Sequence, residues 1–204
     1  MADLPIDLAN AVLAGRLLRS LDVEGKVPRA LEALGPVWGR EVILLGGGIA
    51  RAAQLEALGA TVRVSVDGAG GGGPIDGDDA SADAVVSYWS AFRGASLAEL
   101  GEADRVLRNG GRLLVVHDYG RDDVSRLRGD LPEYGKWSRR DGWFLSNGFR
   151  IRVVHCFWTF ESLDEVGAFL DDTFGADGRA VAATLKRPRL SYNVAIYHRT
   201  RGGG

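Results

Sequence analysis

Three consecutive glycines, Gly46 to Gly48, directly follow a short apolar run over residues 41–45. Glycine allows the backbone to approach a ligand closely, and a helix that begins after such a turn offers free N–H groups and the positive end of its dipole. Asp67 lies 21 positions after Gly46, at the end of the next β-branched run. A carboxylate at that place can accept hydrogen bonds from ribose hydroxyls. The two features together predict a site for an adenosine-containing ligand.

The glycine turn also has a purely structural interpretation. A tight strand-to-helix turn needs glycine even where no ligand binds, and Asp67 ahead of Gly68 is also typical of a solvated turn. The turn alone leaves binding and structural roles equally open, and the spacing to Asp67 favours binding. A structure in which side chains closed the turn would argue against a ligand there.

The segments around the turn alternate between strand-like and helix-like periods. Residues 41–45, 49–58 and 61–66 predict a strand, a helix and a strand, which is a βαβ unit with a parallel pair and a right-handed crossover. Further strands are expected at 83–88, 112–117, 149–157 and 192–197, and helices at 96–107, from Ser162 to Gly175, and at 177–185. This order predicts the α/β class with a doubly wound, mostly parallel sheet, whose ligands bind beyond the carboxyl ends of the strands.

The chain of 204 residues is expected to form a single domain. Residues 1–37 predict a helical cap, because 7–21 place apolar side chains on one helix side and a second helix runs from Pro28 to Leu34. The Rossmann-like core is expected over 38–200, and 201–204 as a flexible tail.

Three segments carry a family resemblance: Val42 to Ala50, Asp83 to Trp89 and Glu102 to Val116. They resemble the first motif, the fourth-strand motif, and the helix, turn and fifth strand of class I S-adenosylmethionine-dependent methyltransferases. The resemblance spans about residues 41–119. Its last segment is the most specific, because both the order and the spacing fit.

The resemblance implies S-adenosylmethionine as the cofactor and methyl transfer to an unidentified small molecule as the activity. It implies that the glycine turn borders the amino-acid moiety of the cofactor, that Asp67 holds the ribose, and that the 87–90 segment lies beside the sulfonium and the substrate. Asp78 or Asp79 is a candidate for the adenine contact. The implied cofactor-binding residues are Gly46, Gly47, Gly48, Asp67, Asp79, Ser87 and Trp89.

The candidate catalytic residues lie at the ends of two expected strands. Methyl transfer requires mainly an in-line approach and exclusion of water, and it needs a general base only for some acceptors. His117 and Asp118, after the 112–117 strand, are the best-placed candidates, and Tyr88 is a third. His117 is also readily explained as a hydrogen-bonded strand-end histidine, and Tyr88 and Trp89 either line the pocket or pack under the N-terminal helices.

The sequence departs from the family pattern at three places. Leu44 stands where the first motif usually carries an acidic residue, and Ala50 where it ends in glycine. Only 15 residues, 68–82, separate Asp67 from Asp83, whereas a helix and a strand with their turns need roughly 20 or more. The third strand and its crossover helix are therefore expected to be missing or reduced, which removes much of the wall around the adenine.

These departures favour an alternative function, a catalytically inactive methyltransferase-like binding or assembly module. A nicotinamide-dinucleotide domain fits less well, because Arg51 stands where that motif requires glycine or alanine.

The composition limits the classes of partner that we expect this protein to bind. The net charge of −2 argues against a dedicated nucleic-acid binder, and the single cysteine, Cys156, rules out an internal disulfide. His117, His155 and His198 lack metal-ligand spacing, so no metal is expected, and His155 is expected in the core. Without a signal-like start or an apolar run near ~20 residues, we expect a cytoplasmic protein that does not contact membranes. The 192–197 strand is expected near a sheet edge, which leaves a homodimer open.

Overall fold

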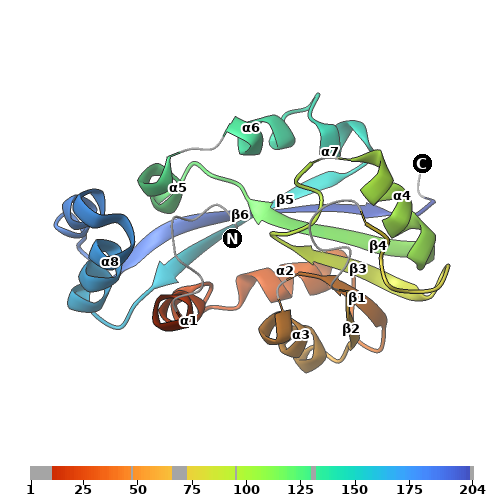
Figure 1. The fold of residues 1–204 in the computed structure, drawn as a ribbon, viewed down its shortest axis with the longest axis horizontal. Coiled ribbons are helices and arrows are strands. Elements are labelled where there is room, and N and C mark those ends of the chain that lie inside the picture. The colour runs from red at the N-terminus through yellow and green to blue at the C-terminus, as the bar shows by residue number, and fades with distance from the viewer. Residues whose placement is uncertain (1–10, 47, 66–72, 95, 130–131, 203–204) are drawn as a thin grey trace.

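The computed structural model describes residues 11–46, 48–65, 73–94, 96–129 and 132–202. These residues form a six-stranded sheet in the order β2-β1-β3-β4-β6-β5 (Figure 1). The strands are β1 (Glu41–Leu45), β2 (Thr61–Ser65), β3 (Ala82–Tyr88), β4 (Leu107–Asp118), β5 (Arg150–Thr159) and β6 (Arg189–Thr200). The pairs β1–β2, β1–β3 and β3–β4 are parallel, whereas β6 runs antiparallel to both of its neighbours. The predicted α/β class with a mostly parallel sheet is confirmed.

Strand β6 lies inside the sheet, between β4 and β5. Tyr192 to Tyr197 are all at most 9% exposed, as expected for a strand that is covered on both faces. The prediction that this strand lies near an edge is therefore wrong, and the homodimer that such an edge would support loses this basis.

Helices cover both faces of the sheet (Figure 1). Neighbouring β1 residues alternate between two core clusters, with Val42 and Leu44 in one and Ile43 and Leu45 in the other. The first cluster is covered by α1 (Ala11–Ser20), α2 (Lys26–Leu34), α3 (Gly48–Ala57) and α8 (Leu163–Ala182). The second is covered by α4 (Leu97–Val106), α6 (Pro132–Ser138) and α7 (Trp143–Ser146).

The helices differ from expectation mainly after β4. The polar, arginine-rich segment after residue 121 contains the short α5 (Asp123–Arg128) as well as α6. Gly175, expected at a helix end, has φ 58° and ψ −128° within α8, a non-helical conformation that separates two helical segments as expected. No helix in the described ranges is long and apolar enough to cross a membrane.

A short segment that is hydrogen-bonded to α4 connects β2 to β3. Among the described residues no strand lies between them, which agrees with the expected loss of the third strand. Ile75 is 4% exposed and packs in the second cluster. Arg105 of α4 donates to the carbonyls of Ile75 and Gly77, each at 2.8 Å, and the Glu102 carboxylate accepts from the Ile75 N–H at 3.1 Å. The connection is thus held by hydrogen bonds to side chains of α4, in a place where no strand pairing holds it among the described residues.

The chain end is more ordered than the expected flexible tail. The Arg201 carbonyl accepts from the Gly110 N–H at 3.1 Å, and the Arg201 N–H donates to the Gly111 carbonyl at 2.9 Å. The expectation of flexibility is wrong for Arg201, because β6 extends into this pair of bonds. Gly203 and Gly204 lie outside the described residues.

Removing the Arg105 side chain should loosen this connection. Arg105→Ala deletes charged hydrogen bonds to two main-chain carbonyls, and we expect it to lower the free energy of unfolding in urea by about 1–3 kcal/mol. The control, Arg139→Ala, removes an exposed arginine paired with Asp141 and should change it by less than ~0.5 kcal/mol. Equal effects of the two variants would contradict the pinning role.

Candidate functional site

The glycine turn lies at the carboxyl end of β1. Gly46 has φ 71° and Gly48 has φ 60°, the left-handed region that glycine adopts readily. Helix α3 begins at Gly48, and the first N–H groups of a helix have no acceptor within it. Gly47 lies outside the described residues. The predicted strand, turn and helix are therefore present.

The two described glycines of the turn differ in their surroundings. A Cβ added to Gly46 would lie 2.1 Å from the Ser90 Oγ, whereas among the described residues nothing lies within 4 Å of one added to Gly48. The Ser90 hydroxyl is fixed there, because it donates to the Leu45 carbonyl at 3.0 Å. The protein itself thus closes the Gly46 side of the turn and leaves the Gly48 side open.

The segment after β3 is held in a strained conformation. Trp89 and Phe92 have φ values of 51° and 64°, which are uncommon for residues other than glycine. The buried Ser87 hydroxyl accepts from the Ala91 N–H at 3.2 Å, and the Phe92 N–H donates to the buried Glu99 carboxylate at 2.9 Å. These bonds fix the path of residues 87–92 beside the turn, so Ser87 shapes the loop.

A buried arginine lies next to the turn. Arg51, in the first turns of α3, is 8% exposed and lies over the rings of Tyr88 and Trp89, 5.2 and 5.5 Å from their centroids. Its guanidinium donates to the Gln54 side chain at 2.7 Å, and in the described part of the chain no carboxylate pairs with it. A buried charge without a counter-ion is unfavourable. The sequence showed Arg51 only as a mismatch to the dinucleotide motif, although its place just after the turn was a usable signal.

Tyr88 packs under the N-terminal helices. It is 2% exposed and shares a cluster with Leu17 and Leu21. Burial raises the pKa of its phenol to about 12, and its hydroxyl has no hydrogen-bond partner among the described residues. Of the two alternatives for Tyr88, the structure favours packing, and its catalytic role stays a prediction.

Asp118 is the centre of a buried polar cluster at the carboxyl end of β4. Its carboxylate accepts from the Trp89 indole at 2.6 Å, from Arg128 at 2.5 Å and from the hydroxyls of Tyr192 and Tyr134. The Asp118 and Arg128 side chains are each 1% exposed. A carboxylate engaged in this way is not free to remove a proton from a substrate, so the arrangement favours a positioning role. Its catalytic role stays a prediction.

His117 points into the opposite core cluster. It is fully buried, with its ring centroid 4.7 Å from that of Trp137 and 6.1 Å from that of Phe144. Neither ring nitrogen has a close hydrogen-bond partner within the described residues, and the backbone of Ala91 contributes a weaker interaction that raises the pKa of the ring. Burial, with a further contribution from Arg93, lowers its pKa to about 3. The imidazole is therefore neutral near pH 7, but aromatic rings cover it.

Asp79 does not lie at this edge of the sheet. It precedes the amino end of β3 and pairs with Arg105 at 3.0 Å, with 81% of its side chain exposed. Because β1 and β3 are parallel, their amino ends lie at the edge opposite the glycine turn. The prediction that Asp79 contacts the adenine is therefore wrong. Asp67 lies outside the described residues.

His155 is also misplaced by the sequence analysis. The buried positions of β5 are Val154, Cys156 and Trp158, whereas His155 is exposed and bonds to the Asn193 side chain at 2.8 Å. The sequence analysis therefore assigned the wrong face of β5 to the core. Within the described ranges, no three His, Cys, Asp or Glu side chains are grouped so that they could hold a metal ion.

The sequence analysis missed the residues that anchor the turn after β4. Asp122 caps α5 in a capping box with Ser125, and its carboxylate accepts from the Asn193 N–H at 2.8 Å. The Asp122–Ser125 spacing was a readable signal of a helix start. The pairing of Arg128 with Asp118 had no such signal.

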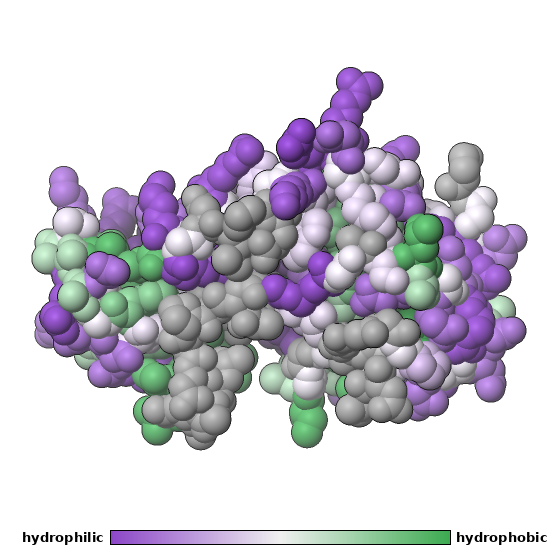
Figure 2. Space-filling view, turned by 45° about the horizontal axis from the view of Figure 1, so that its top comes forward, coloured by the Kyte–Doolittle hydropathy of each residue, from purple (hydrophilic) through white to green (hydrophobic). Residues whose placement is uncertain are grey.

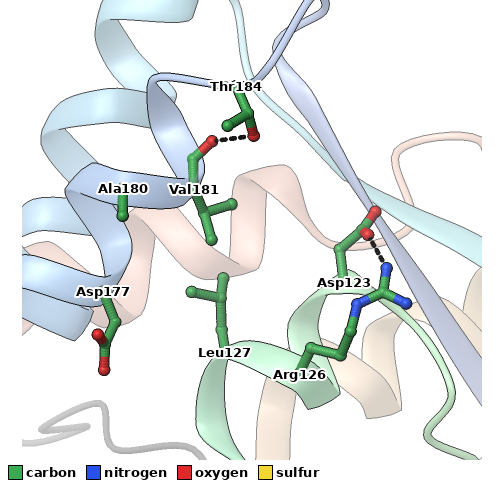
Figure 3. A pocket seen from close by; sticks show the side chains of 7 residues that line it. All are labelled: Asp123, Arg126, Leu127, Asp177, Ala180, Val181 and Thr184. Carbon is green, nitrogen blue, oxygen red and sulfur yellow. Dashed lines mark hydrogen bonds and ion pairs between the residues drawn. The ribbon is translucent and has the colours of Figure 1, made fainter.

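A cleft of about 440 Å³ opens between α5 and α8, away from the glycine turn. Leu127 and Val181 face each other across it, and the Asp123 carboxylate pairs with Arg126 (Figure 3). Asp123 also accepts from the Ser191 N–H at 2.8 Å. Figure 2 shows hydrophobic residues gathered at the α8 end of the molecule.

Comparison with known proteins supports the fold. No family model matches the sequence, and no curated protein is similar enough to count as a relative. A structure from Anabaena variabilis, assigned as a methyltransferase of an antibiotic biosynthesis pathway, is 13% identical, covers 88% of this chain and 98% of its own, and has a TM-score of 0.57. The chain has the class I methyltransferase fold.

Two further structures agree. A protein assigned as a methyltransferase, in complex with the Haloferax volcanii Trm112 methyltransferase activator, is 16% identical over 92% of this chain and 94% of its own, with a TM-score of 0.51. One from Bacillus halodurans C-125 is 12% identical over 86% and 99%, with a TM-score of 0.50. At these identities the likeness establishes the methyltransferase fold alone. The third strand of this fold lies at the sheet edge, so its loss leaves the remaining sheet intact.

Disrupting the buried ion pair between Asp118 and Arg128 should strongly lower the stability of the protein. Asp118→Asn keeps the shape of the side chain but leaves Arg128 charged and unpaired, which we expect to cost about 3–5 kcal/mol in urea unfolding. Asp141→Asn, which affects an exposed pair with Arg139, is the matched control and should change stability by less than ~0.5 kcal/mol. A small effect at Asp118 would show that the cluster is open to solvent.

His117 should make stability depend on pH. The unfolded chain takes up a proton near the ordinary pKa of 6.5, whereas the folded pKa is about 3, so the unfolded state binds more protons between these values. Stability should therefore fall as the pH drops from about 6.5 toward 3. His117→Phe should lack this component in thermal melts across that range, whereas the exposed-site variant His155→Gln should keep it. Identical pH profiles for wild type and His117→Phe would contradict the burial of the imidazole.

Proposed function

We propose that this protein is an S-adenosylmethionine-dependent methyltransferase that acts on a small molecule. The observation that carries the proposal is the glycine turn of a methyltransferase fold, open at Gly48, with the guanidinium of Arg51 buried beside it. Both lie at the carboxyl edge of the sheet, where ligands of open α/β sheets bind.

The described residues fit the amino-acid half of the cofactor. The open backbone at Gly48 and the start of α3 suit a carboxylate, because helix N-termini favour negative charge. Arg51 would pair with the same carboxylate, since guanidinium groups bind carboxylates with two parallel hydrogen bonds. In this proposal Asp67 holds the ribose, and Ser87 and Trp89 form the wall beside the reacting centre.

The chain's own task is to orient the reactants and exclude water. S-Adenosylmethionine, when bound, supplies an electrophilic methyl group, and the acceptor must approach it in line. The Trp89 indole is fixed by Asp118, and Arg51 lies over both Trp89 and Tyr88, so this wall is preorganised. His117 remains the candidate base for acceptors that must lose a proton. With a pKa near 3 the buried imidazole is a weak base, so it would serve in that role only if Trp137 moved aside and exposure to solvent raised its pKa.

A second candidate function is a non-catalytic binding or assembly module. The Ser90 side chain occupies the space beside Gly46, and Leu44 is fully buried where the family carries an acidic anchor. Both observations favour a turn that serves the fold.

Calorimetric titration with S-adenosylmethionine and S-adenosylhomocysteine separates the two functions. We expect micromolar binding to the wild type. Arg51→Gln should weaken it by about tenfold or more, the effect of losing one charged hydrogen bond. Asp67→Ala should also weaken it, through loss of the ribose contact.

Asp79→Ala is the matched control for Asp67→Ala, because Asp79 lies at the opposite edge of the sheet and should leave binding unchanged. Absence of binding to the folded wild type at millimolar ligand would overturn the proposed function and favour the non-catalytic module. Binding that Arg51→Gln leaves intact would instead remove Arg51 from the cofactor site.

A further inference from the structure

A second polar cavity lies at the amino edge of the sheet, opposite the glycine turn. Its volume is about 320 Å³, the space of about ten water molecules at ~30 Å³ each. It is lined by Pro36, Arg40, Asp83, Arg108, Arg112 and the turn at 109–111. These residues precede β1, begin β3 and form the irregular start of β4, where the register with β3 shifts. Its occupant is therefore separate from a methyl acceptor at the carboxyl edge.

The charges that line this cavity are unbalanced. Three guanidinium groups face one carboxylate among the lining residues, all of which belong to the described part of the chain. Arg108 lies 2.8 Å from the Asp83 carboxylate and Arg40 lies 4.0 Å from it, whereas Arg112 donates to the neutral Thr200 hydroxyl at 2.6 Å. About two positive charges thus remain without a counter-ion.

The titration of nearby groups reflects this positive field. Burial alone would raise the pKa of Asp83, yet Arg108, the Glu41 N–H and Arg40 hold it below its ordinary value. At the neighbouring end of β6, burial lowers the pKa of His198, and Arg112 and Arg150 lower it further. Both shifts agree with a cavity that attracts anions.

The backbone of the cavity is fixed in advance. The Gly110 N–H and the Gly111 carbonyl are bonded to Arg201, which holds the turn against the end of β6. A Cβ on Gly111 would lie 2.8 Å from the Arg108 carbonyl, so glycine is needed for the close return of the chain. Arg40 and Arg108, with 57% and 45% of their side chains exposed, can reach a ligand from the rim.

We infer that this cavity binds a phosphoryl group, with a diphosphate-bearing small molecule as its ligand. Arginine forks match phosphate oxygens with paired hydrogen bonds, and three arginines line this cavity, two of them beside Asp83. The volume exceeds the need of one phosphate, which favours two linked phosphoryl groups. The same chemistry could be presented by a nucleic-acid backbone, which the test distinguishes.

The test is calorimetric titration of the full chain with inorganic pyrophosphate at low salt. We expect saturable binding that Arg40→Gln/Arg108→Gln weakens by about tenfold or more, because charged hydrogen bonds are lost. Asp83→Asn should tighten binding several-fold, because it removes the carboxylate that competes for the arginines. Circular dichroism and thermal melts check that each variant is folded, and the two opposite signs keep the test informative if one variant is unstable.

Arg139→Gln/Arg140→Gln is the control, because it removes two exposed arginines elsewhere and so changes the net charge by the same amount. Absence of saturable binding, an equal loss in this control, or no gain in Asp83→Asn would overturn the inference. ADP and a short single-stranded oligonucleotide are titrated in parallel. Competition by ADP supports the small-molecule source. If the oligonucleotide binds more tightly than ADP and its binding depends on the same arginines, the ligand is a nucleic acid and the inference of a small-molecule ligand is wrong.

Discussion

The arrangement of side chains at the carboxyl edge of the sheet depends on the buried ion pair between Asp118 and Arg128. Taking both charges out of water is expensive, and the pair is stable only because indole and phenol donors complete the carboxylate's shell. Through these donors one carboxylate ties the ends of β3, β4 and β6 to α5. The position of the Trp89 indole is thus set by the carboxylate that accepts its hydrogen bond.

Local patterns were enough to predict the architecture. The glycine turn, the βαβ unit and the short 68–82 connection all depend on neighbouring residues, so the sequence showed them directly. The position of β6 was not predictable in this way, because it depends on pairing with strands far along the chain. The face of β5 was misread for a similar reason, since Val154 and His155 are equally compatible with alternation until the covering helices are known.

The places of the candidate residues in the fold were predictable, whereas their surroundings were not. Sequence motifs predicted that Gly46, Gly48, Ser87 and His117 lie at strand ends, and the structure places them there. The hydrogen bonds that each side chain makes are set by its neighbours in space. The Asp118 carboxylate pairs with Arg128, whereas His117 has only a weak interaction with the Ala91 backbone, a difference that neither residue type nor spacing reveals.

The weakly bonded imidazole of His117 has an evolutionary consequence. A polar ring that is buried without a close hydrogen-bond partner among the described residues lowers stability, and an apolar ring of similar size would fill the same space between Trp137 and Phe144 at no such penalty. Selection for heat resistance alone would therefore discard this histidine early. The frequency of His117 in a variant library, selected first for thermostability and then for activity, would show whether the histidine is needed for activity.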